Sequence, residues 1–388
     1  MKFDWNDTIK KIKAKDADEL CKKLLIKSVQ VLKKELGDDW SPDEKHPLLW
    51  RIEIIHVHPS GWAIPILAHG ITKLKVLTGT RDIACRIKAT KCYAGVEAEL
   101  VTASMLAESG YELTYEAVSG KKRPDFLCKK NGIEFLVEVK ALEMSEREQR
   151  IDQTLLDVAA ACSPMTPVGI IFECLTEPLT TEIKCRLKKA AKLVTPALSQ
   201  EVYEQGVLKI YLVHKDDPNR TRKYDEWCSK QKKMGRPHEM CGGLSHPNID
   251  QTERCRIKNR IHKIMQNRQI PDDRVGVPFI FSRFIVADQD IEEFANDIIK
   301  TVHRHPNILA VVLIGAIILV HPQEQTSITE EKNYIKIDHI LAPGLKEQVL
   351  ILRNEFCNSL FDYNLLKDIF VKNSPPRLAG SLDDCSVS

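Results

Sequence analysis

The first third of the chain repeats apolar residues at helical spacing. Between residues 7 and 36, apolar positions such as Ile12, Leu24 and Leu32 recur among lysines and acids, which predicts helix throughout this segment. Gly37 ends the pattern, and residues 43–90 mix apolar runs with prolines and predict no single element. We therefore expect a mostly helical N-terminal region over residues 1–90.

The pattern between residues 95 and 172 changes from helical to alternating and back. A helix is predicted from about residue 95 to 109, with Gly110 as its C-terminal cap. Asn131-Gly132 is the strongest short-range hairpin signal and joins two of the predicted strands. The expected order is helix, three strands, helix, strand, with the later elements at 111–117, 125–130, 133–140, 145–162 and 168–172.

Further helices and strands are predicted beyond this segment. The apolar pattern gives helices at 180–193 and 252–266, and strands at 208–214, 278–281 and 309–320. We read the polar, basic stretch 215–243 as loop-like, and the tail, with its prolines, glycine and serines, as disordered. The resulting division is an N-terminal region (1–90), a core (91–175), a C-terminal α/β extension (176–372) and a tail (373–388).

The predicted hairpin brings two acids together. If Asn131-Gly132 forms a two-residue turn, Lys130 pairs with Ile133, and counting outward places Asp125 directly across from Glu138. Like charges directly opposite each other destabilise a strand pair. A positive charge between these carboxylates would offset that cost.

The second strand of the hairpin sorts its side chains onto two faces. Alternation places an apolar row on one face and Glu138 and Lys140 on the other, the same side as Asp125. The apolar row is Ile133, Phe135, Val137 and Val139. Two carboxylates suit Mg²⁺, which takes oxygen ligands, and we expect Mn²⁺ to substitute for it. Such an ion stabilises charge on a phosphate and lowers the pKa of water, while Lys140 is suited to position or deprotonate that water.

Pro124-Asp125, Glu138-Val139-Lys140 and the order of elements together resemble the PD-(D/E)xK nuclease superfamily, which includes restriction endonucleases and archaeal Holliday-junction resolvases. The resemblance implies an α/β fold with a restriction-endonuclease-like core. It also implies a metal bound by Asp125, Glu138 and the backbone carbonyl of Val139. In the family, an acid on the first helix often completes this site. Counting back from Gly110 favours Glu99, with Glu97 as the alternative.

One position departs from a branch of the family. Recombination-type nucleases often carry Gln-x-x-x-Tyr on the helix after the lysine, and here Asp157 stands where the tyrosine would follow Gln153. The resemblance therefore implies a Mg²⁺-dependent endodeoxyribonuclease, and the large flanking regions favour a restriction or defence-type enzyme. The alternatives are a non-catalytic nucleic-acid-binding protein that retains a nuclease fold, and an RNA-directed nuclease. By resemblance, a homodimer is also expected.

Contacts to DNA must come from local patches, because the formal net charge is only +3. Lys121, Lys122 and Arg123 precede Asp125 and are the first candidates for phosphate contact. A second group lies on the predicted helix 252–266, where an apolar face opposes a basic one that holds Arg256, Arg260 and Lys263. The competing interpretation of the second group is an ordinary solvated helix face.

The cysteines and the apolar runs indicate a cytoplasmic protein with no membrane partner. The 12 cysteines are spread singly, unlike the framework of a small secreted domain. No signal-peptide pattern is visible, and the longest apolar run, 308–320, is shorter than the roughly 20 residues that span a bilayer. A structural Zn²⁺ is not favoured, since the candidate ligands fit no compact zinc pattern; they are Cys228, His238, Cys241, His246 and Cys255.

Overall fold

The computed structural model divides the chain into two compact units. One unit holds residues 1–142 and 253–388, and the other, residues 143–252, is inserted between them in the chain. The core predicted at 91–175 is therefore split at residue 142. The structure describes residues 3–14, 19–43, 46–53, 63–75, 83–115, 123–142, 167–171, 180–204, 208–214, 216–233, 244–245, 249–282, 291–319, 325–342, 345–357 and 361–372.

The N-terminal region is helical, as predicted. The segment expected to be helical from 7 to 36 is two helices, and short helices follow in the region that the sequence left unassigned. The elements are α1 (Trp5–Ala14), α2 (Glu19–Leu36), α3 (Pro47–Glu53), α4 (Ala63–Lys75), α5 (Ile83–Lys88) and α6 (Tyr93–Glu108). Their buried residues, including Ile12, Leu32 and Leu106, belong to one apolar core.

Helix α6 ends at the predicted glycine. Gly110 has φ +80°, and its N–H donates to the carbonyl of Ala107 while the N–H of Tyr111 donates to that of Leu106. This pair of bonds is the Schellman motif, and it turns the chain directly into the first strand. The predicted cap is confirmed.

An eight-stranded mixed sheet forms the centre of the larger unit, in the order β1-β2-β3-β8-β9-β12-β11-β10. Strands β3, β8 and β9 run parallel, and all other neighbours are antiparallel. The bounds are β1 (Glu112–Tyr115), β2 (Phe126–Lys130), β3 (Ile133–Ala141), β8 (Gly276–Phe281), β9 (Ala310–Leu319), β10 (Ser327–Glu330), β11 (Tyr334–Ala342) and β12 (Leu345–Arg353).

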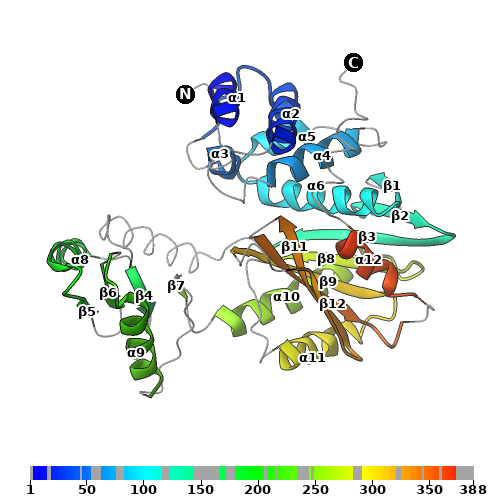
Figure 1. The fold of residues 1–388 in the computed structure, drawn as a ribbon. Coiled ribbons are helices and arrows are strands. Elements are labelled where there is room, and N and C mark those ends of the chain that lie inside the picture. The colour runs from blue at the N-terminus through cyan, green and yellow to red at the C-terminus, as the bar shows by residue number, and fades with distance from the viewer. Residues whose placement is uncertain are drawn as a thin grey trace. The chain divides into compact units, whose positions relative to one another are not determined.

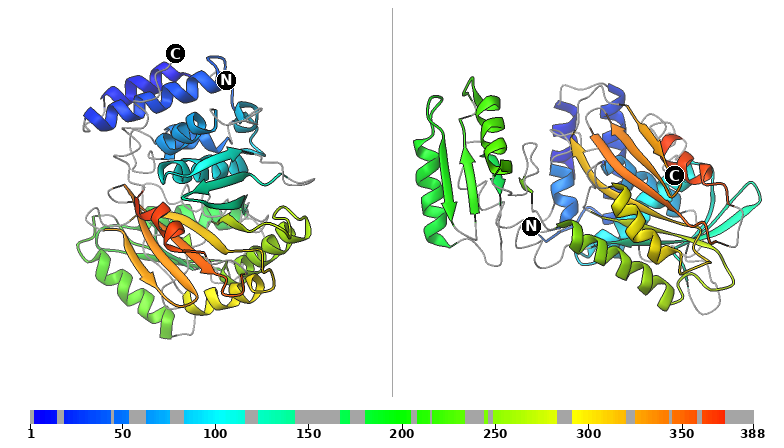
Figure 2. Two further views of the ribbon diagram at one scale, coloured as in Figure 1. Left: turned by 90° about the vertical axis from the view of Figure 1, so that its right-hand side faces the viewer. Right: turned by 90° about the horizontal axis from the view of Figure 1, so that it is seen from below.

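Helices cover both faces of this sheet (Figures 1 and 2). The N-terminal helices, α6 and α12 (Asn364–Lys372) share an apolar core with one face. Helices α10 (Ile249–Gln266) and α11 (Ile291–Val302) pack on the other face. The sequence predicted α10 and β9 but neither α11, α12 nor the antiparallel strands β10–β12.

The hairpin of β2 and β3 has the predicted register. Lys130 pairs with Ile133, and the last ladder pair is Phe126 with Val137, so Asp125 lies one position beyond it. Asn131 and Gly132 have φ of +52° and +78°, as a type I′ turn requires. The apolar face of β3 joins the core beneath α6, which leaves the acids on the face that α10 covers.

The predicted fourth strand of the core was assigned wrongly. Residues 167–171 do form a strand, β4, but it lies in a separate sheet of the inserted unit, in the order β5-β6-β4-β7. The strand beside β3 is β8, with α10 before it in the chain. An apolar run identifies a buried strand but not its partner, so the insertion was invisible to pattern analysis. The helix predicted at 145–162 lies outside the described residues.

In its described residues, the inserted unit carries two helices with its sheet. Its elements are β4 (Pro167–Ile171), α8 (Thr181–Leu193), β5 (Gln200–Glu204), β6 (Leu208–Leu212), α9 (Arg220–Lys233) and β7 (Leu244–Ser245). The loop-like prediction for 215–243 is wrong where α9 forms. Trp227 of α9 is buried and stacks on Tyr211 of β6, and this non-local contact is not visible in a polar sequence.

No helix among the described residues is both long and apolar enough to cross a membrane. The tail predicted to be disordered, 373–388, falls outside the described residues.

Candidate functional site

Three of the predicted site residues converge on the α10 face of the sheet. The Lys140 ammonium donates to Oε1 of Glu138 and lies 3.9 Å from Oδ2 of Asp125. The backbone N–H of Val139 donates to the same Asp125 oxygen at 2.7 Å. Glu138 is only 1% exposed, whereas Asp125 and Lys140 are half-buried, so the cluster reaches from the protein interior to solvent. The hairpin thus brings both acids and the ammonium together, as predicted.

The cluster holds more negative charge than one ammonium can neutralise. Burial raises the pKa of Asp125 well above its usual value, and the charges of Glu138 and Glu99 raise it further. The charge of Lys140 lowers this pKa but does not offset the rise. Burial also raises the pKa of Glu138, although Lys140 opposes that shift. Two carboxylates that both resist ionisation would be stabilised by a further cation.

Gln269 is a site residue that the sequence did not reveal. Its side-chain amide donates to Oε1 of Glu138, the oxygen that already accepts from Lys140. Gln269 is placed there by the turn that ends α10, in which Arg268 adopts φ +50° and the Gln269 N–H donates to the carbonyl of Ile264. Because this cap has arginine where glycine is usual, no sequence signal marked it.

The second oxygen of Glu138 has no hydrogen-bond partner among the described residues. Oε2 is buried and accepts no hydrogen bond from any residue that the structure describes. A buried carboxylate oxygen without a donor is costly, so such groups call for a water or an ion. The residues present therefore fit a divalent cation, with Oε2 as the oxygen that is free to bind it.

The acid on the first helix is held by other groups. Arg86 of α5 donates to both oxygens of Glu99, at 2.5 and 2.9 Å, and the Tyr115 hydroxyl of β1 donates to one of them at 2.7 Å. Glu99 still acts on the cluster, because its charge raises the pKa of Asp125 and of Glu138. Glu97 instead pairs with Arg51 of α3 at 2.7 Å. Of the two alternatives, Glu99 is the acid that influences the site.

The described residues contain no group of three or more His, Cys, Asp or Glu side chains placed to hold a metal ion. Ligation by Glu99 in addition to Asp125 and Glu138 therefore stays a prediction, as does ligation by the Val139 carbonyl. Mg²⁺ is often held by only one or two carboxylates and several waters, which is compatible with the two acids found here.

The predicted nucleic-acid contacts lie in several places. Arg123 is exposed next to Pro124-Asp125, and Lys121 and Lys122 fall outside the described residues. On α10, Lys263 is exposed while Arg256 and Arg260 are half-buried. The opposite face of α10 is buried as predicted, through Ile257, Ile261 and Ile264. Binding of DNA by these residues stays a prediction.

The zinc candidates do not form a described cluster. Cys255 is exposed on α10 and Cys228 lies on α9. His238, Cys241 and His246 are outside the described residues. The structure therefore does not test a zinc site.

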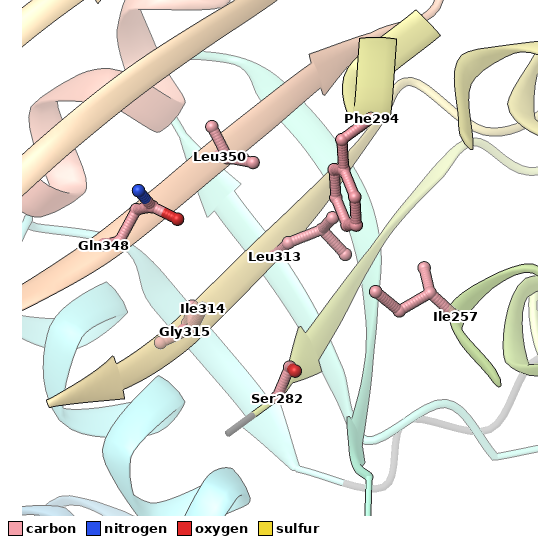
Figure 3. A pocket seen from close by; sticks show the side chains of 8 residues that line it. All are labelled: Ile257, Ser282, Phe294, Leu313, Ile314, Gly315, Gln348 and Leu350. Atoms are coloured by element: carbon pink, nitrogen blue, oxygen red, sulfur yellow. The ribbon is translucent and has the colours of Figure 1, made fainter. Parts of the chain in front are cut away.

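A small apolar hollow lies on the sheet face that α10 and α11 cover (Figure 3). Two polar side chains, Ser282 and Gln348, line it. The apolar lining comes from α10, α11, β9 and β12 and includes Ile257, Phe294, Leu313 and Leu350. None of the predicted site residues lines it.

Comparisons with known proteins assign neither a family nor a function to this chain. Neither family models, nor curated proteins, nor solved structures gave a match to this chain. A functional assignment therefore depends on the geometry of the site.

Proposed function

We propose that this protein is a metal-dependent nuclease that hydrolyses phosphodiester bonds in DNA. The observation that carries the proposal is the cluster of Asp125, Glu138 and Lys140, in which a half-buried and a fully buried carboxylate share one ammonium. An excess of negative charge that is shielded from water is costly, and a bound proton or cation relieves it. Acid-acid-lysine is the residue set that the PD-(D/E)xK resemblance implies.

Asp125 and Glu138 would hold the metal, and Oε2 of Glu138 is the oxygen already available for it. When bound, Mg²⁺ supplies positive charge that stabilises the developing charge on a phosphate and lowers the pKa of water. Gln269 would keep the Glu138 carboxylate oriented, because it fixes Oε1 and leaves Oε2 free. The Val139 N–H would keep the Asp125 carboxylate oriented, because it donates to Oδ2.

Lys140 is placed to act on the substrate. Its side chain is partly exposed, and its ammonium contacts both acids. An ammonium in this position would neutralise a non-bridging phosphate oxygen or orient the attacking water. These two roles match those expected for the lysine of the motif.

The topology supports the same class of protein. The order α6, β1, β2, β3, α10, β8, with β8 parallel to β3, is helix, three strands, helix, strand once the insertion is set aside. This is the order of a restriction-endonuclease-like core. A restriction or defence-type role and a homodimer remain part of the proposal.

One observation favours a second candidate. Both oxygens of Glu99 are taken by Arg86 and Tyr115, as expected in a nuclease fold that binds nucleic acid without cutting it. Cleavage is therefore the property to test, on DNA and on RNA in parallel.

The test is nicking of supercoiled plasmid with Mg²⁺ and with EDTA. We expect wild type to cut only with Mg²⁺, and Asp125→Asn and Lys140→Ala to lose about 100-fold or more of the rate, the usual scale for such groups. Lys129→Ala is the matched control, because Lys129 lies on the same hairpin but pairs with Glu134 at 2.8 Å. Equal rates for wild type and all variants, or no Mg²⁺ dependence, would overturn the proposal, and cleavage of RNA alone would replace its substrate.

A further inference from the structure

Helix α8 of the inserted unit carries a compact group of exposed lysines. Lys188, Lys189 and Lys192 are all exposed, and none has an ion-pair partner within the described part of the chain. The spacings of three and four residues place them side by side on one helical face. We refer to these three residues as the α8 lysine face.

The opposite face of α8 fixes the direction of these lysines. Leu187 and Ala191 are buried, Val194 follows them, and the helix packs beside β5. Thr180 caps the helix by accepting a hydrogen bond from the Ile183 N–H. With its apolar stripe buried in this way, α8 presents the lysine face to solvent.

Several basic residues on α9 and α10 are paired with acids. On α9, Lys223 pairs with Asp217 at 2.7 Å and Arg222 contacts Glu226 at 3.7 Å. On α10, Lys258 pairs with Asp297 at 2.8 Å. The α8 lysine face has no such compensation among the described residues, and like charges three or four residues apart destabilise a helix by a few tenths of a kcal/mol per pair. A bound polyanion would relieve that repulsion.

We propose that the α8 lysine face binds the phosphate backbone of duplex DNA. The choice of DNA rests on the proposed function, and a phosphate backbone is the polyanion that such a protein must hold. The inserted unit begins at residue 143, just after Lys140 in the chain. DNA held by α8 is thereby kept at a raised local concentration for the site borne by the same polypeptide.

A membrane surface is the competing partner, because Leu193 and Leu198 are exposed near the end of α8. It is disfavoured because a helix that lies in a bilayer needs its apolar stripe free, and the stripe of α8 is already buried. Vesicle binding is therefore included as an outcome of the test.

The experiment compares the full chain with the triple variant Lys188→Glu/Lys189→Glu/Lys192→Glu. Binding of a fluorescein-labelled duplex is followed by anisotropy in EDTA over a salt series, so that no cleavage occurs. We expect the variant to lose affinity by about tenfold or more at low salt. The slope of log affinity against log salt should shrink by about 0.9 for each phosphate that the variant no longer neutralises.

The matched control places the same charge change elsewhere. Lys10, Lys13 and Lys23 are exposed on α1 and α2, and their triple change to Glu should leave affinity and slope close to wild type. Equal loss in both triple variants, no loss in either, or no duplex binding by wild type would each overturn the inference. So would selective loss of binding to phosphatidylserine vesicles with unchanged duplex binding.

Failure of this inference and failure of the proposed function give different results. If wild type binds the duplex through the α8 lysine face but no Mg²⁺-dependent cut appears, the nuclease proposal fails and the binding surface stands. If cutting depends on Asp125 while the α8 variant binds like wild type, the reverse holds.

Discussion

The pKa values of Asp125 and Glu138 are raised because of where the hairpin places these carboxylates. Each carboxylate alone could form an ordinary ion pair with Lys140, but the hairpin places both within reach of the same ammonium. Arg86 is already committed to Glu99, so it does not supply the missing charge. The excess charge therefore belongs to the Asp125–Glu138 pair, and substitutions that remove it should stabilise the metal-free protein.

Asp125→Asn removes this excess and keeps an oxygen that can accept the Val139 N–H. We expect it to raise the free energy of unfolding in EDTA at pH 7 by about 1 kcal/mol, since an uncompensated buried charge is removed. Urea denaturation of both proteins measures the difference. Lower stability of the variant at every pH would contradict this account.

The sign of the pH dependence follows from the raised pKa of Asp125. The folded chain holds this proton more tightly than the unfolded chain, so the stabilisation is complete below the unfolded pKa of about 3.9. It is lost as the pH rises through the folded pKa. The advantage of Asp125→Asn should therefore grow above about pH 4. Glu134→Gln on the same strand should show the opposite sign, because a hydrogen bond from Lys129 lowers the pKa of Glu134.

At the scale of elements, the β2–β3 hairpin positions the site. Its turn sets the register, and the register decides that Asp125 and Glu138 face the same side. The turn needs positive φ at two successive residues, and Gly132 occupies the second position at +78°. The backbone conformation of Gly132 therefore sets the register that brings Asp125 and Glu138 together.

Gly132→Ala should destabilise the protein by about 1 kcal/mol, the usual strain of an L-residue in this region. Steric clash is not the cause, because an added Cβ would meet nothing within 4 Å. Gly95 within α6 is the matched control, since it is equally open but helical. Gly95→Ala should stabilise by about 0.5–1 kcal/mol. Thermal denaturation measures both changes, and equal signs for the two variants would show that backbone conformation is not the cause.

Local signals in the sequence were sufficient for these elements. Asn131-Gly132 predicted the hairpin and its register, and Gly110 predicted the end of α6, because each acts on neighbours a few residues away. The contacts of Gln269 with Glu138 and of Arg86 with Glu99 were missed, since they join elements distant in sequence. Periodicity contains no information about such pairings.

At the scale of the whole chain, the sequence does not predict that residues 143–252 form a unit inserted into the larger one. Parallel strands such as β3 and β8 need a crossover connection, and here that connection contains residues 143–252 before α10 completes it. The apolar run 168–172 predicts the last strand of the core, but β8 holds that place in the structure, because both candidates are short apolar runs. The larger unit thus keeps one contiguous sheet although its sequence is interrupted.

The most direct test of the central claim is binding of Mn²⁺ to the full chain, followed by the loss of the free-ion signal in electron paramagnetic resonance. We predict that wild type binds the ion and that Asp125→Asn and Glu138→Gln both lose binding. Lys140→Ala should retain it, because the ammonium competes with the metal for Glu138. A wild-type protein that leaves millimolar Mn²⁺ free, or acid variants that bind like wild type, would contradict the account.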